Sequence, residues 1–392
     1  MGDRTLKVLT LSTLFPDATR PTFGVFVERQ TVGLAARDNV EVKVVAPIGL
    51  PPAPLQGESH KALAALPLRE NWKGLEVYRP RFTALPIVGG AINPWMMRRA
   101  IAPLLTEIRR DFAFDVIDAE FFYPDGPAAV ALGQRFGVPV SIKARGADIS
   151  YWGRRRGCGG QVLAAGRAAA GMLAVSGALR DEMIALGMPE DRIRVHHTGV
   201  DQRAFRPMDR AAAKAALGVS GPFVVTIGHL IPRKSQSLTI AAMAQVPDAT
   251  CWVVGQGPDE AKLRGEIAAL GLQDRVHLIG PKPHEALPGI LAAADVMALP
   301  SASEGLANVW VEALACGTPI VVGDIGGADE VVDRPAAGRI VARETGAVAA
   351  AIRALIADPP AQTDVAEAAR RFTWERNGEV LEAHLRGLVA LP

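Results

Sequence analysis

The chain has 392 residues, a length at which a single hydrophobic core usually gives way to two domains. Hydrophobic residues make up 49% and charged residues 21%, a balance typical of soluble globular proteins and not of disordered ones. The formal net charge of +2 gives no field that would indicate nucleic acid as a partner.

The cysteines and the apolar runs indicate the redox compartment of the protein and whether it crosses a membrane. Cys158, Cys251 and Cys316 are odd in number and lack the short spacings of a zinc site or redox pair. Residues 1–12 lack the order of a secretory signal, and no apolar run reaches the roughly 18 to 20 residues that cross a bilayer. We therefore expect a cytoplasmic protein that is not exported by that route and does not span a membrane.

Short apolar runs alternate with helical patterns along the whole chain, which is typical of parallel strands joined by crossover helices. The first half begins with a strand at 6–11, a loop through 16–24, a helix at 25–36 and a strand at 40–46. Further strands are expected at 115–119, 138–143, 171–175 and 193–196.

A turn-rich stretch near residue 200 has no apolar periodicity and predicts the interdomain linker. A second series follows, with strands expected at 223–227, 250–254, 276–279, 296–299 and 319–322. A final helix, 374–388, is long enough to cross back to the first half. The sequence thus predicts an α/β protein with two Rossmann-like domains, 1–201 and 202–373, and a C-terminal segment, 374–392, that packs back on the N-terminal domain.

Two adjacent cations, Arg233 and Lys234, follow the strand at 223–227 and open a helix. Backbone N–H groups and the dipole of a helix N-terminus favour a phosphate there, and the two cations would neutralise its charge without a metal. A solvated basic turn explains this segment equally well. Gly255 and Gly257 follow the next strand and would let the backbone approach a ligand closely, although Gly-x-Gly alone is a weak signal.

The segment 300–319 carries two glutamates in different settings. Glu304 is expected in a loop at the carboxyl end of a strand, where open α/β sheets bind ligands, and it could accept hydrogen bonds from sugar hydroxyls. Glu312 lies in an apolar helix, where a carboxylate needs donors such as a ribose diol. The alternatives are a solvated or helix-capping Glu304, and a Glu312 bound to a backbone N–H or an arginine.

No Asp-x-Asp pair is present to hold a divalent ion against a diphosphate, and the histidines lack metal-ligand spacing. We expect no metal and no cofactor. The Ser176-Gly177 pair lacks the context of a nucleophile elbow, which disfavours a serine hydrolase.

The segment from Glu304 to Glu312 resembles the paired-glutamate motif of the retaining family 4 glycosyltransferases, whose two Rossmann-like domains face each other across a cleft (GT-B). The resemblance covers almost the whole chain. Phe23-Gly24-Val25-Phe26 looks like the family's first glycine loop, Arg145-Gly146-Ala147-Asp148 its Arg-Gly-x-Asp element, and Gly199-Val200-Asp201 its interdomain element.

The resemblance implies a role for each matching residue. Lys234 and Arg233 would hold the donor diphosphate, and Gly24 would approach it from the opposite wall. Glu304 would contact the donor sugar, and Glu312 would bind the ribose. The family places Arg145 and Asp148 in the acceptor or phosphate region and implies retention of anomeric configuration. Stabilisation of the leaving diphosphate could come from the backbone N–H groups of Gly305, Leu306, Ala307 and Asn308.

Two positions depart from the family pattern. His229 stands where many relatives have an arginine, which makes the charge there pH-dependent. Glu120 stands at the end of a strand where a histidine usually faces the sugar. Glu120 is therefore a candidate catalytic residue that would bond a sugar or acceptor hydroxyl, or a sign of altered or lost activity.

The expected reaction moves a sugar from a nucleotide diphosphate sugar to a glycan or lipid-linked acceptor. Apolar residues Ile87, Val88, Ile92, Trp95, Met96 and Met97 mix with Arg98, Arg99, Arg109 and Arg110, and residues 151–156 add a second basic-aromatic cluster. These clusters suit an anionic membrane face or a lipid-linked diphosphate, or they are core helix with solvated arginines. A nucleotide-sugar epimerase and an inactive nucleotide-sugar-binding scaffold are the alternative functions.

Overall fold

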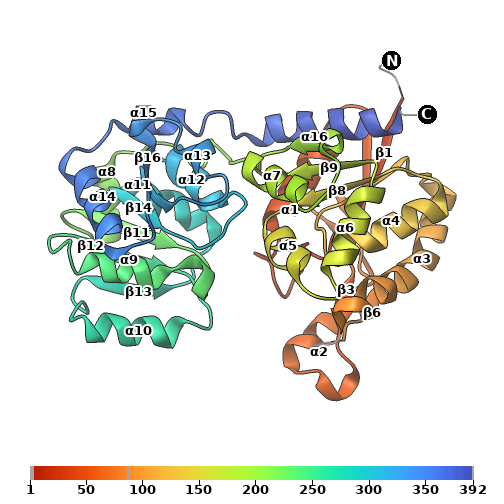
Figure 1. Ribbon diagram of the computed structural model, residues 1–392, viewed down its shortest axis with the longest axis horizontal. Coiled ribbons are helices and arrows are strands. Elements are labelled where there is room, and N and C mark those ends of the chain that lie inside the picture. Colours follow the sequence, from red (N-terminus) through yellow and green to blue (C-terminus); the bar gives the residue numbers. More distant parts are fainter. Residues whose placement is uncertain (1–3, 86–88, 391–392) are drawn as a thin grey trace. The chain divides into compact units, whose positions relative to one another are not determined.

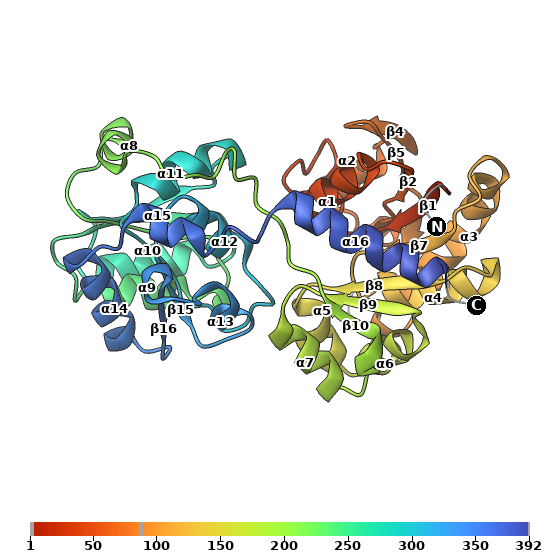
Figure 2. The ribbon, with the colours of Figure 1, turned by 90° about the horizontal axis from the view of Figure 1, so that it is seen from above.

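The computed structural model describes residues 4–85 and 89–390, and the chain forms two compact units. Unit 1 consists of residues 1–198 and 374–392, and unit 2 of residues 199–373. The boundary lies three residues before the expected end of the first domain at 201. Figures 1 and 2 show an α/β arrangement in each unit, with strands covered by helices.

Unit 1 is built on an eight-stranded sheet of order β10-β9-β8-β7-β1-β2-β5-β4. All neighbouring strands are parallel except β4 and β5, which are antiparallel. The strands are β1 (Leu6–Leu11), β2 (Val40–Val45), β4 (Arg69–Trp72), β5 (Leu75–Tyr78), β7 (Val116–Ala119), β8 (Val140–Ala144), β9 (Gly171–Ala174) and β10 (Ile193–Val195). A separate parallel pair joins β3 (Ile48–Leu50) and β6 (Arg81–Thr83).

The helices of unit 1 cover both faces of this sheet. They are α1 (Val25–Ala35), α2 (Glu58–Ala64), α3 (Asn93–Asp111), α4 (Asp125–Phe136), α5 (Ala147–Ser150), α6 (Gly159–Ala168), α7 (Gly177–Ala185) and α16 (Trp374–Val389). α1 packs beside α16 on one face, and α4 packs on the other face together with α3 and α6. Because β7, β8 and β9 are covered on both sides, every residue in them is buried.

The C-terminal helix α16 belongs to unit 1. Leu381 and Leu385 are one helical turn apart and join a core cluster with Val8 of β1 and Leu34 of α1. Each fully buried leucine contributes roughly 1.5 to 3 kcal/mol of transfer free energy. Glu382 of the same helix also forms an ion pair with Arg37.

Unit 2 is built on a six-stranded parallel sheet of order β13-β12-β11-β14-β15-β16. The chain runs outward from β11 to β13, then returns to the other side of β11 with β14. The neighbours β11 and β14 therefore form the topological switch point of this sheet. The strands are β11 (Phe223–Ile227), β12 (Thr250–Val254), β13 (Val276–Gly280), β14 (Val296–Leu299), β15 (Ile320–Gly323) and β16 (Gly338–Val341).

The helices of unit 2 enclose a core of buried aliphatic side chains from β11, β12, α9, α10 and α14. They are α8 (Arg210–Leu217), α9 (Gln236–Met243), α10 (Glu260–Ala269), α11 (Leu287–Ala293), α12 (Asn308–Ala315), α13 (Ala328–Val331), α14 (Thr345–Ala357) and α15 (Gln362–Glu367). In the described part of the chain, no helix is both long and apolar enough to cross a membrane.

The expected strands are confirmed to within two residues at each end, and those at 6–11, 223–227, 250–254 and 296–299 have the observed bounds. The strands β3 to β6 and β16 were not predicted. They are short, and the edge strand β4 begins with three polar residues in a row, which form no apolar run.

Candidate functional site

The candidate site of unit 2 lies at the switch point, where the loops after β11 and β14 leave the sheet at its carboxyl edge. Arg233 and Lys234 form the 3-10 turn Pro232–Lys234 after β11. Ser235 then adopts a left-handed conformation with φ 55°, and α9 begins at Gln236. The cations thus precede the helix and do not lie in its first turn.

Direct contacts hold the two loops together. The N–H of Ala302 donates to the carbonyl of Arg233 at 2.7 Å, and Arg233 Nη1 donates to the carbonyl of Ser303 at 2.7 Å. Gly326 follows β15, and a Cβ there would lie 2.1 Å from the Glu304 carbonyl oxygen. The loop carrying Glu304 is therefore fixed from both sides.

The neighbouring Gly-x-Gly segment has a structural role that the sequence did not reveal. A Cβ on Gly255 would lie 1.9 Å from the Gly228 carbonyl oxygen, and one on Gly257 would lie 2.3 Å from that of Leu230. These glycines let the loop after β12 pack against the loop after β11. Close packing between loops explains them without a ligand.

Glu304 contacts both cations. Lys234 Nζ lies 2.6 Å from Glu304 Oε1, and Arg233 Nη1 lies 3.2 Å from Glu304 Oε2. The carboxylate is only 8% exposed, whereas Arg233 is 39% exposed. One negative and two positive charges leave the cluster with a positive charge at the carboxyl edge of a parallel sheet, an arrangement that can bind an anion.

Glu312 lies on α12 and bonds a histidine, not the backbone or an arginine. His284 Nε2 lies 2.9 Å from Glu312 Oε1. The ring of His284 packs edge-on against Phe205, with centroids 5.1 Å apart. The pair leaves Glu312 partly exposed and oriented by a neighbour, which a binding carboxylate needs.

The segment 305–308 connects the two glutamates. Leu306 and Ala307 are buried, and Asn308 begins α12, whose N-cap Ala307 has no side-chain acceptor for the first N–H groups. The carbonyl of Gly305 accepts a hydrogen bond from the N–H of Gly327. The start of α12 therefore offers backbone donors beside Glu304.

In unit 1, Gly24 is the N-cap of α1 and has φ 69°. A Cβ at this position would lie 2.3 Å from the carbonyl oxygen of Leu14. Close approach between the loop and the helix start requires glycine here, whatever ligand the loop binds.

Glu120 follows β7 and is buried inside unit 1. Its two carboxylate oxygens accept hydrogen bonds from Gln30 of α1 and from Arg145, which follows β8. Lys143 in turn donates to Gln30 and contacts His196 Nδ1. The structure thus places Glu120 in a buried polar network under α1 and gives both of its oxygens protein partners.

Burial sets the protonation of this network. It lowers the pKa of Lys143 to about 7, helped by the charge of Arg145. Burial and Lys143 lower the pKa of His196 well below its usual value, and burial and Glu120 raise that of Asp118. Neutral His196 then accepts from Lys143 at Nδ1 and donates from Nε2 to the carbonyl of Asn377 on α16.

Arg145 and Asp148 form a tight turn after β8. The carboxylate of Asp148 accepts from the backbone N–H groups of Arg145, Gly146 and Phe122 at 2.8 to 3.1 Å. Asp148 is fully buried, and burial raises its pKa. The turn orients Arg145, whose guanidinium lies 4.6 Å from the ring centroid of Phe26 in α1.

Sequence reasoning did not identify His284, Lys143 or Gln30. His284 lies 28 residues before Glu312, so no local pattern connects them. Its place just after β13, at the carboxyl edge of the sheet, was the available signal. No group of three or more His, Cys, Asp or Glu side chains is placed to hold a metal ion within residues 4–85 and 89–390.

Two family models match the chain. Residues 24–203 match the model described as Glycosyltransferase Family 4, and residues 208–372 match Glycosyl transferases group 1. The chain is also 37% identical over 215 residues to D-inositol 3-phosphate glycosyltransferases of Mycobacterium tuberculosis and Mycobacterium bovis. That match covers 51% of this chain and 45% of the relatives, so the chain spans about half the length of the curated relatives it matches.

Solved structures share the fold over nearly the whole chain. Sucrose-phosphate synthase from Thermosynechococcus elongatus superposes with a TM-score of 0.77 at 20% identity, covering 98% of this chain and 99% of that one. HepE from Anabaena in complex with UDP gives 0.74 at 22% identity, covering 97% and 100%. The two parallel-sheet units therefore have the architecture of GT-B glycosyltransferases.

Proposed function

This chain belongs to glycosyltransferase family 4, and on that premise we propose that it transfers a sugar from a nucleotide diphosphate sugar to a hydroxyl acceptor. Anomeric configuration is retained, and no metal takes part. The donor binds unit 2 at the carboxyl edge of its sheet.

The observation that carries the proposal is the cluster of Arg233, Lys234 and Glu304 at the switch point. Its surplus positive charge suits a diphosphate, since charge-assisted hydrogen bonds contribute roughly 1.5 to 3 kcal/mol each. Glu304, 2.6 Å from Lys234 Nζ, is held where it can accept a sugar hydroxyl next to that diphosphate. The two cations supply the positive charge that a divalent metal supplies elsewhere.

Glu312 and His284 supply the nucleoside end of the same site. The second oxygen of the Glu312 carboxylate can accept hydrogen bonds from two hydroxyl groups, which fits the ribose diol, and His284 fixes its orientation from the other side. The first N–H groups of α12 lie between the two glutamates. They stabilise the diphosphate as it gains charge on leaving, which accelerates the chemical step and not only binding.

Unit 1 binds the acceptor, for which we propose a glycan or lipid-linked hydroxyl compound at the cytoplasmic face of the membrane. The mycobacterial relatives are named for D-inositol 3-phosphate. That phosphorylated cyclitol therefore belongs in the acceptor panel beside saccharides and polyprenyl diphosphate sugars.

The first test is a thermal-shift screen of the full chain against nucleoside diphosphates and their sugar conjugates, with EDTA present. UDP and UDP-glucose head the panel because the HepE structures contain them. A ligand at one hundred times its Kd stabilises the native state by about 2.7 kcal/mol. A shift with one nucleotide family, followed by donor hydrolysis, supports the proposal; no shift with any nucleotide overturns it.

Variants then separate the roles. Lys234→Ala should weaken diphosphate binding about 10- to 100-fold, from the loss of one charge-assisted bond, whereas the control Lys262→Ala, an exposed lysine on α10, should not. Glu312→Ala should mainly weaken nucleotide binding, and Glu304→Ala should mainly lower turnover of the sugar donor. Equal and negligible effects at both glutamates would contradict these roles. Binding without transfer to any acceptor would favour a scaffold, and conversion of the donor to its epimer would favour an epimerase.

A further inference from the structure

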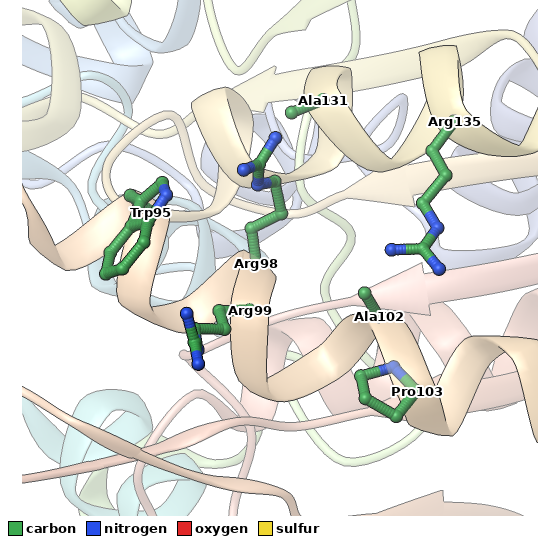
Figure 3. A pocket seen from close by; sticks show the side chains of 7 residues that line it. All are labelled: Trp95, Arg98, Arg99, Ala102, Pro103, Ala131 and Arg135. Carbon is green, nitrogen blue, oxygen red and sulfur yellow. The ribbon is translucent and has the colours of Figure 1, made fainter.

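A basic hollow lies on the outer helical layer of unit 1, between α3 and α4. It is a cavity of about 260 Å³, against the roughly 10 to 15 Å³ that one water needs, so it has room for a phosphate with part of its ester. Arg98 extends from α3 toward α4, and Arg135 extends from α4 toward α3 (Figure 3). Arg99 completes the set of cations, and Ala102 and Ala131 give the hollow apolar walls.

The three arginines are exposed, and no described carboxylate forms an ion pair with any of them. Residues 93–106 of α3 include no acidic side chain. Three like charges around one hollow repel each other, and a bound anion relieves that repulsion. Guanidinium groups pair with phosphate through two parallel hydrogen bonds, which makes a phosphate ester the fitting anion.

Apolar side chains lie next to these cations. Trp95 and Ile92, in the first turn of α3 and directly before it, are 49% and 40% exposed. The guanidinium of Arg99 lies 5.7 Å from the centroid of the Trp95 ring. Tryptophan beside arginine is typical of a surface that enters the headgroup region of a bilayer.

The structure brings the second basic-aromatic cluster, residues 151–156, close to the start of α3. The turn at Gly90 accepts hydrogen bonds from Tyr123, from Cys158 Sγ at 3.4 Å and from Gln161 Nε2 at 3.2 Å. These bonds connect the start of α3 with the segment that carries Tyr151, 52% exposed, and the exposed Arg156. Ile87 and Val88 lie outside the described residues, and Met97 is buried in the core.

The hollow is not at the edge where this unit would bind a reacting substrate. α4 starts at the carboxyl end of β7, and Ala131 and Arg135 lie in its second half, toward the amino ends of the strands. Open α/β sheets bind the molecules they transform at the carboxyl edge. A phosphate held between α3 and α4 therefore serves attachment and not turnover.

We propose that this hollow binds the headgroup phosphate of an anionic phospholipid, and that Trp95 and Ile92 enter the interface beside it. This proposal rests on the membrane association within the proposed function and assigns that association to α3 and α4. Vesicle binding needs neither donor nor acceptor, so it can hold or fail independently of sugar transfer.

The test is co-sedimentation of the full chain with vesicles of phosphatidylcholine, alone or with 30% phosphatidylglycerol. The triple variant Arg98→Gln/Arg99→Gln/Arg135→Gln should bind the anionic vesicles about 100-fold more weakly, because each arginine near such a surface strengthens binding about fivefold. The matched control, Arg264→Gln/Arg353→Gln/Arg370→Gln, removes three exposed arginines from unit 2 and should change binding less than threefold. Equal losses of vesicle binding in both triple variants would mean that net charge alone determines the binding, and would overturn the proposed site.

Trp95 gives a second readout. Brominated lipids should quench part of the fluorescence of this six-tryptophan chain, and Trp95→Phe should remove that quenching while the protein still sediments with vesicles. Equal binding to vesicles without anionic lipid would overturn the proposal. A second result would also overturn it: inorganic phosphate stabilises the parent protein against heat but not the arginine triple variant, and no vesicle binds. The hollow would then bind a soluble phosphate.

Discussion

Asp125 connects the first loop of unit 1 to α4 through a buried carboxyl group. Its Oδ2 accepts from the backbone N–H of Thr13 at 2.9 Å, and its Oδ1 accepts from the Thr13 hydroxyl at 2.8 Å. Burial raises the pKa of Asp125 to about 7, although both bonds from Thr13 oppose the rise. The carboxyl group is therefore protonated in the native state over a pH range in which the unfolded chain is ionised.

The sign of the effect follows from proton binding. Between pH 3.8 and 7 the native state holds a proton that the unfolded state has lost, so the free energy of unfolding falls as pH rises. Each pH unit costs about 1.4 kcal/mol, which gives about 3 kcal/mol between pH 5 and pH 7. Asn cannot ionise, so Asp125→Asn removes this loss and keeps a side chain of the same shape.

We therefore expect the free energy of unfolding of Asp125→Asn to rise by about 3 kcal/mol relative to that of the parent protein when both are moved from pH 5 to pH 8. Because the chain has two units, pulsed hydrogen exchange along a urea gradient should follow α4 and β1 separately from unit 2. Asp38→Asn, which removes an exposed carboxyl group from the same unit, controls for other effects of an Asp-to-Asn change. A difference that stays constant, or that moves against the variant with rising pH, would refute the reasoning.

Two further predictions concern unit 2. His284→Ala should raise KM for the donor several-fold with little change in kcat, because His284 orients Glu312 and does not itself contact the sugar. An equal fall in kcat would assign His284 a direct role in the reaction. Gly257→Ala should destabilise unit 2 by about 1 to 3 kcal/mol, since its Cβ would meet the Leu230 carbonyl at 2.3 Å. Gly265→Ala, in open space on α10, should instead stabilise it by about 0.5 to 1 kcal/mol, and a thermal melt that ranks the two glycines the other way would contradict this packing.

The central strands could be predicted from sequence because of where they lie. β11 and β14 are covered by helices on both faces, so they appear as apolar runs with sharp ends, interrupted only by Thr226 in β11. The edge strand β16 contains Gly338 and Arg339, and only one of its sides is paired. Such a strand has no apolar run for a sequence pattern to detect.

The candidate site was only partly accessible from sequence for a different reason. Glu304 and Lys234 were identified because strand ends and motif spacing are local properties. Their mutual contact depends on β11 and β14 being neighbours, which is set by packing across 70 residues of chain. The partnership of Glu312 with His284 likewise exists only after β13 and α12 are placed in the same unit.

Glu120 is the residue for which sequence and geometry suggest different roles. By position in the motif it would face the sugar, whereas in the structure it is buried and bonded to Gln30 and Arg145. Glu120→Gln keeps the shape but removes the charge that compensates Arg145 and Lys143. Breaking a buried ion pair costs about 3 to 5 kcal/mol, so we expect unit 1 to lose stability on that scale.

Separate measurements on the two units discriminate between these roles. If Glu120 acts within the network, Glu120→Gln should lower the unfolding midpoint of unit 1 while the Kd for the nucleoside diphosphate, measured by calorimetry, stays unchanged. Because Lys143 loses a nearby carboxylate, its pKa should fall further, and the destabilisation should be larger at pH 6 than at pH 9. A variant that melts like the parent at both pH values but no longer turns over the donor would instead make Glu120 a catalytic residue. Stabilising the buried network would then not be the role of Glu120.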